Sequence, residues 1–391
     1  MPLQVLHVIP FFDPASQFGG PVSLLRELCP RLAALDLRLR VITTDNGLGA
    51  EVPRDCWVDR AGYQVWYGRS RWFERRPPYW SPGLQGILRQ AISAADVVHA
   101  SIGLTLLNVQ VRQLARRARV PYVYTAQGCL CPTRLRRRRL EKILFLRLFE
   151  RGVLRGAAAL QALTAKENDD YRRQGADADR IHVIPNGVVV NGRARRELGA
   201  LFRQRRGIPT AAPLVLFLGR LEDVKGIDLL LRAMANVHKR HAKIHLVLAG
   251  PDFGFERVAR DLVTLLGLQE QVHFTGPVFG VEREAVFGAA DLFALTSYSE
   301  GLPLAVLEAA ALGLPLLITE RCHAPEVEYY HAGKVVAATV DAVTSGLEEL
   351  LDDRDRWPLL GDRARRMAED CFSIDVVARK LADLYHRLAQ R

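Results

Sequence analysis

Leu214-Val-Leu-Phe-Leu-Gly-Arg-Leu-Glu-Asp-Val-Lys-Gly226 joins five consecutive apolar residues to a charged loop that begins and ends in glycine. A short apolar run that stops at a glycine is typical of a strand buried on both faces of a parallel sheet. Ligands of open parallel sheets bind at the carboxyl ends of the strands, which is where this charged loop lies. The segment therefore predicts one strand and one binding loop of a doubly wound α/β domain.

Similar apolar runs recur on both sides of this segment, with room for helices between them. Downstream they predict strands at 244–248, 272–274, 292–295 and 315–319. Upstream they predict strands at 5–9, 39–43, 97–99, 122–125, 158–163 and 182–184, with helices at 22–35 and 104–118. The pattern weakens in the basic stretch 191–213, and 391 residues exceed what one core usually organises. We therefore expect two doubly wound domains, 1–195 and 196–373, with a last helix in 374–391 packed back on the first.

The composition, 49% hydrophobic and 25% charged, is that of a globular protein. The N-terminal MPLQVLHVIPFF has no basic region before its apolar run, so we interpret it as a buried strand rather than a signal peptide. No apolar stretch has the length of a membrane span, and the six cysteines are scattered, so we expect a cytoplasmic protein with reduced thiols. The net charge of +11 favours anionic partners such as nucleotides, phosphates, acidic lipids or nucleic acid.

The stretch Ser299-Glu-Gly-Leu-Pro-Leu-Ala-Val-Leu-Glu308 follows a predicted strand and opens a helix. Gly301 permits close backbone approach, Pro303 suits the first helical position, and the helix N-terminus would attract an anion. Glu300 lies in the loop, where it can accept hydrogen bonds from hydroxyls. Glu308 lies inside the helix, where a buried, unpaired carboxylate would be costly unless sugar hydroxyls satisfied it. An ordinary strand-to-helix connection with surface glutamates fits the spacing equally well.

Two further loops have the composition of phosphate-binding sites. Arg220 and Lys225 flank the loop after the first quoted strand, where two cations could hold a pyrophosphate, although solvated charged loops are common there. Gly19 and Gly20 precede the first helix and could let backbone amides reach a phosphate or a sugar, or simply form a turn.

Taken together, these loops resemble the retaining GT-B glycosyltransferases of family 4, whose signature is the glutamate pair spaced as Glu300 and Glu308. The supporting motifs are HVIPNGV (182–188), LGRLEDVKG (218–226), LVLAGP (246–251), DVVHAS (96–101) and the C-terminal FSIDVVARKLADLY. The resemblance implies a GT-B fold, with two Rossmann-like doubly wound domains facing a central cleft. The domain 1–195 would then take the acceptor and the domain 196–373 the nucleotide-sugar donor.

The resemblance also implies a role for each residue. Arg220 and Lys225 would neutralise the diphosphate of a UDP- or GDP-linked hexose, so no metal or other cofactor is expected. Glu308 would bind the ribose hydroxyls. Glu300 would contact the transferred sugar, with the backbone of Gly301 and Leu302 beside it. Gly19 and Gly20 would approach the donor phosphate. The Asp-x-Asp triplets at 177–179 and 353–355 lack the strand-end context of a metal site.

The N-terminal domain departs from the family pattern at two positions. Gln127 and Ser101 stand where many relatives have a histidine, which indicates an unusual acceptor or weakened activity. His99 remains a candidate catalytic residue, and with Gln127 a candidate for the acceptor side, although a structural histidine at a strand end is nearly as good an interpretation.

A basic run, Arg134-Leu-Arg-Arg-Arg-Arg139, opens a predicted helix that carries further arginines to Arg155. We interpret 134–155 as a docking surface for anionic lipid headgroups or a lipid-diphosphate saccharide acceptor, with a solvated helix face as the alternative. The protein is thus expected in the cytoplasm, with peripheral contact to the inner face of the cytoplasmic membrane.

Three rival functions remain open at this point. A sugar-nucleotide-binding partner subunit would keep the fold and lose catalysis. A nucleic-acid-binding protein would use the positive charge, but no binding module or interleaved aromatic residues are evident. A dinucleotide-dependent oxidoreductase would need G-x-G-x-x-G after the first strand, which that loop lacks.

Overall fold

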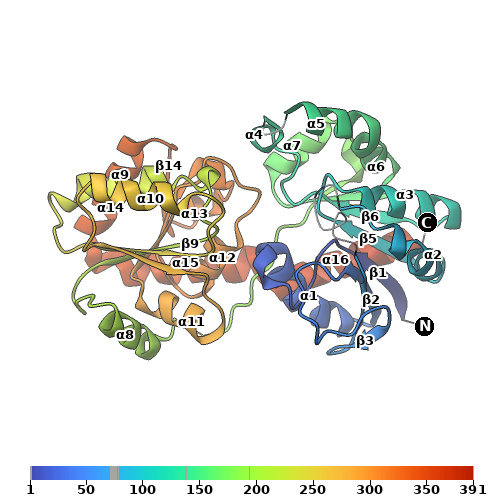
Figure 1. Cartoon of the computed structure of the whole chain (residues 1–391), viewed down its shortest axis with the longest axis horizontal. Coiled ribbons are helices and arrows are strands. Elements are labelled where there is room, and N and C mark those ends of the chain that lie inside the picture. Colours follow the sequence, from blue (N-terminus) through green and yellow to red (C-terminus); the bar gives the residue numbers. More distant parts are fainter. Residues whose placement is uncertain (1, 71–76, 78, 137–138, 193, 391) are drawn as a thin grey trace. The chain divides into compact units, whose positions relative to one another are not determined.

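The computed structural model describes residues 2–390 except 71–76, 78, 137–138 and 193. It divides into two compact units, of which unit 1 comprises the described parts of Met1–Gly187 and Ile374–Arg391, and unit 2 is Val188–Ser373 (Figure 1). The chain thus first passes from unit 1 to unit 2 after Gly187. This point is earlier in the chain than the boundary between residues 195 and 196 that the sequence suggested.

The described residues of unit 1 form an eight-stranded sheet in the order β3-β4-β2-β1-β5-β6-β7-β8. All neighbouring strands are parallel except the β3–β4 pair. The strands are β1 (Leu3–Val8), β2 (Leu37–Thr44), β3 (Trp57–Asp59), β4 (Gln64–Gly68), β5 (Val97–Ser101), β6 (Tyr122–Thr125), β7 (Ala159–Ala162) and β8 (Ile181–Val183). The strand order reverses direction between β1 and β5, so the loops after these two strands meet at a topological switch point.

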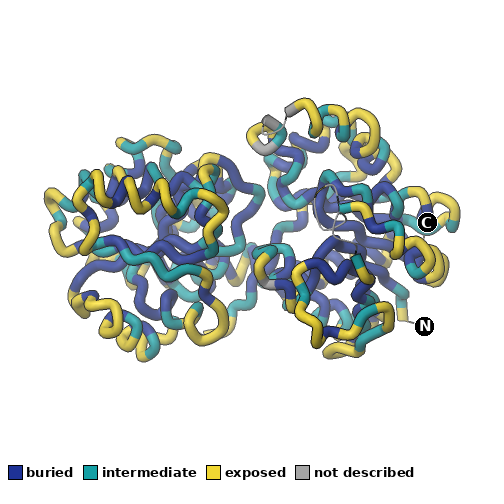
Figure 2. The backbone as a smooth tube through the Cα atoms, in the orientation of Figure 1, coloured by how far each residue is buried: buried dark blue, intermediate teal, exposed yellow. Residues whose placement is uncertain are grey.

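Helices cover this sheet, and its strands β5, β6 and β7 are buried along their whole length (Figure 2). They are α1 (Gly20–Ala33), α2 (Gln85–Ser93), α3 (Leu106–Ala118), α4 (Pro132–Arg136), α5 (Arg139–Phe145), the π-helical η3 (Leu146–Glu150), α6 (Arg151–Gly156), α7 (Ala165–Arg173) and α16 (Ile374–Ala389). The predicted helix 104–118 begins two residues later because Thr105 caps it, its side chain accepting from the Asn108 amide. The last helix, α16, packs on α1, β1 and β5 and buries an apolar face there.

Unit 2 contains a six-stranded, wholly parallel sheet in the order β11-β10-β9-β12-β13-β14 among its described residues. The strands are β9 (Leu214–Leu218), β10 (His245–Ala249), β11 (Val272–Gly276), β12 (Leu292–Leu295), β13 (Leu316–Thr319) and β14 (Gly333–Val336). This is the Rossmann order, and its switch point lies between β9 and β12. The prediction of two Rossmann-like doubly wound domains is confirmed.

The helices of unit 2 lie on both faces of this sheet. They are α8 (Arg196–Arg205), α9 (Ile227–His238), α10 (Glu256–Leu265), α11 (Gly280–Ala289), α12 (Leu304–Ala311), α13 (Glu326–Tyr329), α14 (Val340–Asp352) and α15 (Trp357–Phe372). Helix α8 falls in the basic stretch where the sequence indicated no clear strand. It is held by close packing on α11, where a Cβ at Gly199 would lie 2.1 Å from the Gly288 carbonyl carbon. None of the helices in the described residues is both long and apolar enough to cross a bilayer.

Candidate functional site

The switch point of unit 2 brings together the two loops that the sequence singled out. β9 and β12 are hydrogen-bonded neighbours, so the segments that follow them leave the same edge of the sheet side by side. The first carries Arg220 and the 3₁₀ turn Asp223–Lys225, and the second carries Ser297 and Glu300 before α12 begins. Residues 75 positions apart in the chain therefore share one site.

Lys225 and Glu300 form an ion pair across these loops. The Lys225 Nζ lies 2.5 Å from the Glu300 Oε1, which also accepts a hydrogen bond of 2.7 Å from the Ser297 hydroxyl. The side chains are 12% and 5% exposed, respectively. A charge-assisted bond of this length in a nearly dry position holds both groups in place, because breaking it would leave a buried charge without a partner.

Gly226 is required where these two loops meet. Its φ is +61°, and a Cβ there would lie 2.0 Å from the Thr296 carbonyl oxygen, so any other residue would collide with backbone. The Thr296 hydroxyl donates to the Gly226 carbonyl at 2.7 Å, and the Tyr298 amide donates to the Val224 carbonyl at 2.8 Å. The ion pair thus rests on a rigid backbone support.

Arg220 presents a second, more accessible cation on the β9 loop. Its guanidinium lies 3.1 Å from the Glu222 carboxylate and 4.8 Å from the centre of the Phe253 ring. Its side chain is 35% exposed, against 12% for Lys225. A guanidinium oriented on one side by a carboxylate and an aromatic face can still donate to an anion from its free edge.

Glu308 differs from expectation in its surroundings. We predicted a buried carboxylate in need of a partner, but its side chain is 24% exposed and forms an ion pair with Arg283 of α11. Because Arg283 already neutralises Glu308, this carboxylate does not need sugar hydroxyls to offset the cost of burial. Part of the carboxylate is still open to solvent. No motif in the sequence indicated Arg283, because the contact joins two helices of unrelated pattern.

The N-terminus of α12 lies beside the same loops. Leu304 begins the helix, so Pro303 occupies the cap position rather than the first helical position as predicted. No side chain caps this end. Gly301 is half-buried and Leu302 is buried just before it. The N-terminus of α12 therefore lies at the carboxyl edge of the sheet, and its cap residue Pro303 supplies no side-chain acceptor.

At the switch point of unit 1, the glycine pair opens α1. Gly19 has a φ of +75° and caps the helix without a side-chain hydrogen bond, and Gly20 is the first helical residue. A Cβ at Gly19 would meet nothing within 4 Å, so glycine is needed there for its dihedral angle rather than for space.

His99 lies in the interior of unit 1 and is only 3% exposed. Its Nδ1 lies 2.7 Å from the Tyr385 hydroxyl of α16, and its Nε2 lies 2.7 Å from the Thr125 hydroxyl. The Tyr385 hydroxyl also lies 3.0 Å from the His7 Nε2. Burial lowers the pKa of His99 well below its usual range and that of His7 to about 4. With both ring nitrogens engaged inside unit 1, His99 fits the structural interpretation and not the catalytic one.

Gln127 occupies a strained loop at the carboxyl end of β6. Gln127 and Gly128 have φ values of +57° and +73°, and the loop after β5 has Ile102 at +72°. The Glu167 carboxylate holds this segment by accepting from the Gly128 amide at 2.6 Å. Non-glycine residues in the left-handed region cost free energy and cluster at functional sites, so this edge is the best acceptor-side candidate in unit 1. Ser101 ends β5 nearby and is buried.

Glu150 lies below this edge and makes unit 1 sensitive to pH. It is fully buried, accepts hydrogen bonds from the Tyr124 hydroxyl and the Leu104 amide, and has its pKa raised to about 7 by burial. The pKa of Glu150 in the folded protein is higher than its value of 4.5 in the unfolded chain. Its contribution to the folding stability of unit 1 is therefore fully present below pH 4.5 and is lost as the pH rises through about 7. We predict that Glu150→Gln abolishes this loss, so that the variant gains roughly 3 kcal/mol over the wild type between pH 4.5 and 8.

Denaturant unfolding of both proteins across that pH range measures this difference. Glu51→Gln, an exposed glutamate of the same unit, is the control. Parallel stability curves for the wild type and Glu150→Gln would contradict the prediction.

The two Asp-x-Asp triplets lie at short turns. Asp177 caps a 3₁₀ turn and approaches Arg180, and Asp353 pairs with Arg356 at 3.1 Å. Within the described residues, no three histidine, cysteine, aspartate or glutamate side chains gather as a metal site would require.

Two family models together match most of the chain. The model described as glycosyl transferase 4-like domain matches residues 19–187, and the one described as glycosyl transferases group 1 matches residues 200–369. The chain belongs to this glycosyltransferase family. The second match includes Arg220, Lys225, Glu300 and Glu308, and the first includes the Gly19 turn and the strained loops of unit 1.

Individual relatives agree with the family models. This chain is 31% identical to a D-inositol 3-phosphate glycosyltransferase of Nocardia farcinica over 73% of its own length and 65% of the relative's. It is 33% identical to a GDP-mannose-dependent alpha-(1-6)-phosphatidylinositol monomannoside mannosyltransferase of Mycobacterium tuberculosis, over 55% of its length and 54% of the relative's. The aligned regions thus span less than two thirds of these relatives.

Among solved structures, the fold is similar to that of Anabaena HepE in complex with UDP and glucose. The TM-score is 0.77 and the identity 19%, with 98% of this chain and 100% of the other covered. Similarity at this identity concerns the fold, which is the GT-B type that the motifs predicted.

Proposed function

We propose that this chain is a retaining, metal-independent glycosyltransferase that moves a hexose from a nucleotide-sugar donor to a glycan or lipid-linked saccharide. The observation that carries the proposal is the Lys225–Glu300 pair at the switch point of unit 2, with Arg220 on the same loop. The site offers what a departing nucleoside diphosphate needs, namely two fixed cations and an uncapped helix N-terminus.

In this proposal the site residues divide into two groups. Lys225, Arg220 and the first amides of α12 contact the diphosphate. In unit 1, Gly19 and Gly20 offer backbone donors to a phosphate. Glu308 binds the ribose hydroxyls, and Arg283 fixes the orientation of its carboxylate. Glu300, flanked by the backbone of Gly301 and Leu302, accepts hydrogen bonds from the hexose.

The proposed reaction keeps the anomeric configuration by displacement on one face of the sugar. The bond from the anomeric carbon to the leaving phosphate oxygen breaks as the acceptor oxygen bonds to that carbon, and the acceptor proton passes to the leaving phosphate. Glu300 is not proposed as a nucleophile, because its Oε1 is already engaged by Lys225 and Ser297. Lys225 and Arg220 stabilise the charge on the phosphate without a metal.

The relatives narrow the choice of substrates. One is named for inositol 3-phosphate, one for GDP-mannose and a phosphatidylinositol mannoside, and the Anabaena structure contains UDP and glucose. A UDP- or GDP-linked hexose and an acceptor for surface polysaccharide or glycolipid synthesis fit these names. With such acceptors we propose a cytoplasmic protein that makes peripheral contact with the inner face of the membrane through 134–155.

The test is binding of UDP, GDP, ADP and their sugar conjugates to the wild type and to Glu308→Ala, with EDTA present. We expect one nucleotide to bind, EDTA to have no effect, and the variant to bind 10- to 100-fold more weakly, since hydrogen bonds to a charged group contribute roughly 1.5–3 kcal/mol. Glu349→Ala, an exposed glutamate of the same unit, is the matched control.

The outcomes separate the rival functions. Absence of nucleotide binding would overturn the donor site. Tight binding without transfer to any acceptor would instead favour a sugar-nucleotide-binding partner subunit, in keeping with Gln127 in the place of a histidine.

A further inference from the structure

A pocket of about 710 Å³ opens on unit 1 away from the edge that carries Gln127. Val120, Pro121 and Tyr122 line it at the amino end of β6, whereas Gln127 follows the carboxyl end of that strand. Substrates of doubly wound sheets bind at the carboxyl ends, so this pocket has no part in the proposed transfer reaction.

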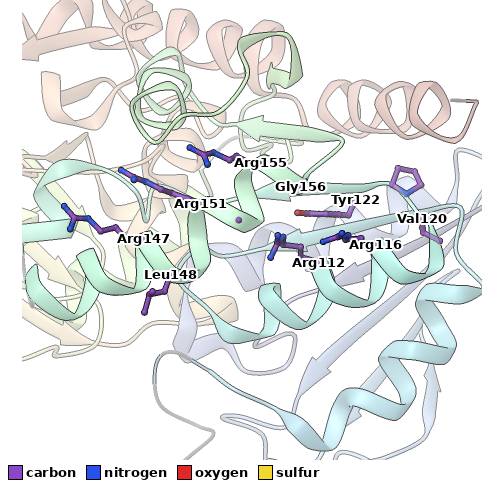
Figure 3. Close-up of a pocket in the computed structure, with 11 residues that line it drawn as sticks. Arg112, Arg116, Val120, Tyr122, Arg147, Leu148, Arg151, Arg155 and Gly156 are labelled. Atoms are coloured by element: carbon purple, nitrogen blue, oxygen red, sulfur yellow. The ribbon is translucent and has the colours of Figure 1, made fainter.

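Arginines dominate the lining. Arg112 and Arg116 come from α3, Arg147 from η3, and Arg151 and Arg155 from α6 (Figure 3). They recur every four residues along both walls, so like charges are neighbours on each helix surface, which is destabilising. Within the described part of the chain, none of the five forms an ion pair with a carboxylate. An anion in the pocket would relieve this repulsion.

Two glycines of α6 let side chains of the pocket pack closely on this helix. A Cβ at Gly152 would lie 3.1 Å from the Arg112 Cζ of α3, and a Cβ at Gly156 would lie 2.8 Å from the Tyr122 hydroxyl of β6. The glycines therefore leave room for the Arg112 side chain and the Tyr122 ring at the pocket wall. The wall also contains the π-helical turn Leu146–Glu150, a rare element that is frequent at functional sites.

A row of exposed leucines adjoins the arginines. Leu140, Leu144 and Leu148 recur every four residues along α5 and η3 and are 85%, 58% and 63% exposed. Leu148 also lines the pocket. A leucine row beside a basic face is the pattern of a segment that lies in a membrane interface, with its apolar side chains at the acyl boundary and its cations at the phosphates.

We propose that this pocket binds the phosphate of an anionic glycerophospholipid while Leu140, Leu144 and Leu148 enter the bilayer interface. The inference rests on the peripheral contact proposed above and gives it a defined site. Arg137 and Arg138 of the predicted basic run lie outside the described residues, as do the side chains of Arg134, Arg136 and Arg139. A phosphodiester satisfies cations from both walls at once, which a neutral lipid cannot do.

The experiment is co-sedimentation of the full chain with vesicles of phosphatidylcholine, with and without phosphatidylglycerol, in the absence of any donor. We expect binding only to the anionic vesicles and loss of binding in 1 M salt, where screening acts within about 3 Å. Arg116→Ala/Arg151→Ala, which removes one exposed arginine from each wall, should weaken binding roughly 10- to 100-fold, as each cation at the surface contributes about 1 kcal/mol.

Two further variants make the result specific. Arg117→Ala/Arg172→Ala removes the same charge from exposed positions outside the pocket and should weaken binding no more than about threefold. Leu144→Ser/Leu148→Ser keeps the charge and should also weaken vesicle binding, which a pocket for a soluble phosphate would not require. Nucleotide binding by unit 2, measured without vesicles, should be the same in all three variants, so failure of the donor site is detected separately.

Several results would overturn the proposal. Equal losses of vesicle binding in Arg116→Ala/Arg151→Ala and in Arg117→Ala/Arg172→Ala would mean that binding depends only on net charge. Equal binding to neutral and anionic vesicles would exclude phosphate recognition. Thermal protection by inorganic phosphate without vesicle binding would replace the bilayer with a soluble ligand. A shift of random duplex DNA that depends on Arg116 and Arg151, again without vesicle binding, would assign the pocket to nucleic acid.

Discussion

Replacing Lys225 with alanine should lower the rate of sugar transfer by about 10²- to 10³-fold, the effect of losing one preorganised donor to the charge that develops on a leaving group. Lys225 is the least exposed cation of the site and lies at the switch point of the sheet, so water is a poor replacement for its charge. The rate of nucleotide release from the donor identified by the binding survey measures this effect.

The same substitution leaves Glu300 buried without its cation, which by itself destabilises unit 2 by about 3–5 kcal/mol. A second variant, Lys225→Met/Glu300→Gln, removes both charges together. We expect it to regain most of the stability and none of the activity. Recovery of activity in the double variant would show that Lys225 merely neutralises Glu300. Lys334→Ala, which breaks an exposed lysine–glutamate pair of the same unit, should change neither the stability of unit 2 nor the rate of sugar transfer.

Replacing Tyr385 with alanine should destabilise unit 1 by about 3–5 kcal/mol, the usual cost of truncating a buried aromatic residue. Tyr385 is fully buried, and its hydroxyl joins the C-terminal helix to His7 of β1 and His99 of β5. The truncation opens a cavity at the contact of α16 with the sheet and leaves two buried imidazoles without that partner. Denaturant unfolding at neutral pH measures the loss.

Tyr385→Phe separates the two contributions. It keeps the ring and removes only the hydroxyl, so it should cost about 1–3 kcal/mol from the unsatisfied histidine nitrogens. His386→Ala, exposed on the neighbouring position of α16, should be neutral. A stability of Tyr385→Ala equal to that of the wild type would contradict the assignment of α16 to unit 1.

Much of the candidate site of unit 2 could be predicted from the sequence because its signals are local. The run Leu214–Leu218 and the loop to Gly226 predict a strand and a binding loop without knowledge of any other element, and the motif from Ser299 to Glu308 does the same for the second loop. The alternation of apolar runs with helical patterns then fixes the class of fold, because it reflects strands buried on both faces.

The tertiary structure alone decided which of these residues meet and how deeply they are buried. The Lys225–Glu300 pair arises because β9 and β12 are neighbours in the sheet, and the Arg283–Glu308 pair because α11 approaches α12. The burial of His99 beneath α16 depends on a helix that follows it by nearly 300 residues, as its bond to Tyr385 shows.

In the arginine pocket, too, the sequence predicted the local element and the tertiary structure decided the contacts. The sequence indicated a basic helix, but it gave no reason to associate Arg112 and Arg116 with Arg151 or to expect that two glycines admit the Arg112 side chain and the Tyr122 hydroxyl beside α6. Periodicity and turn chemistry are properties of neighbouring residues, so the sequence predicted most of the buried strands and the loops after β9 and β12, but not β3, β4, β14 or α8. Contact, burial and charge pairing depend on sheet order and helix packing, which only the folded chain defines.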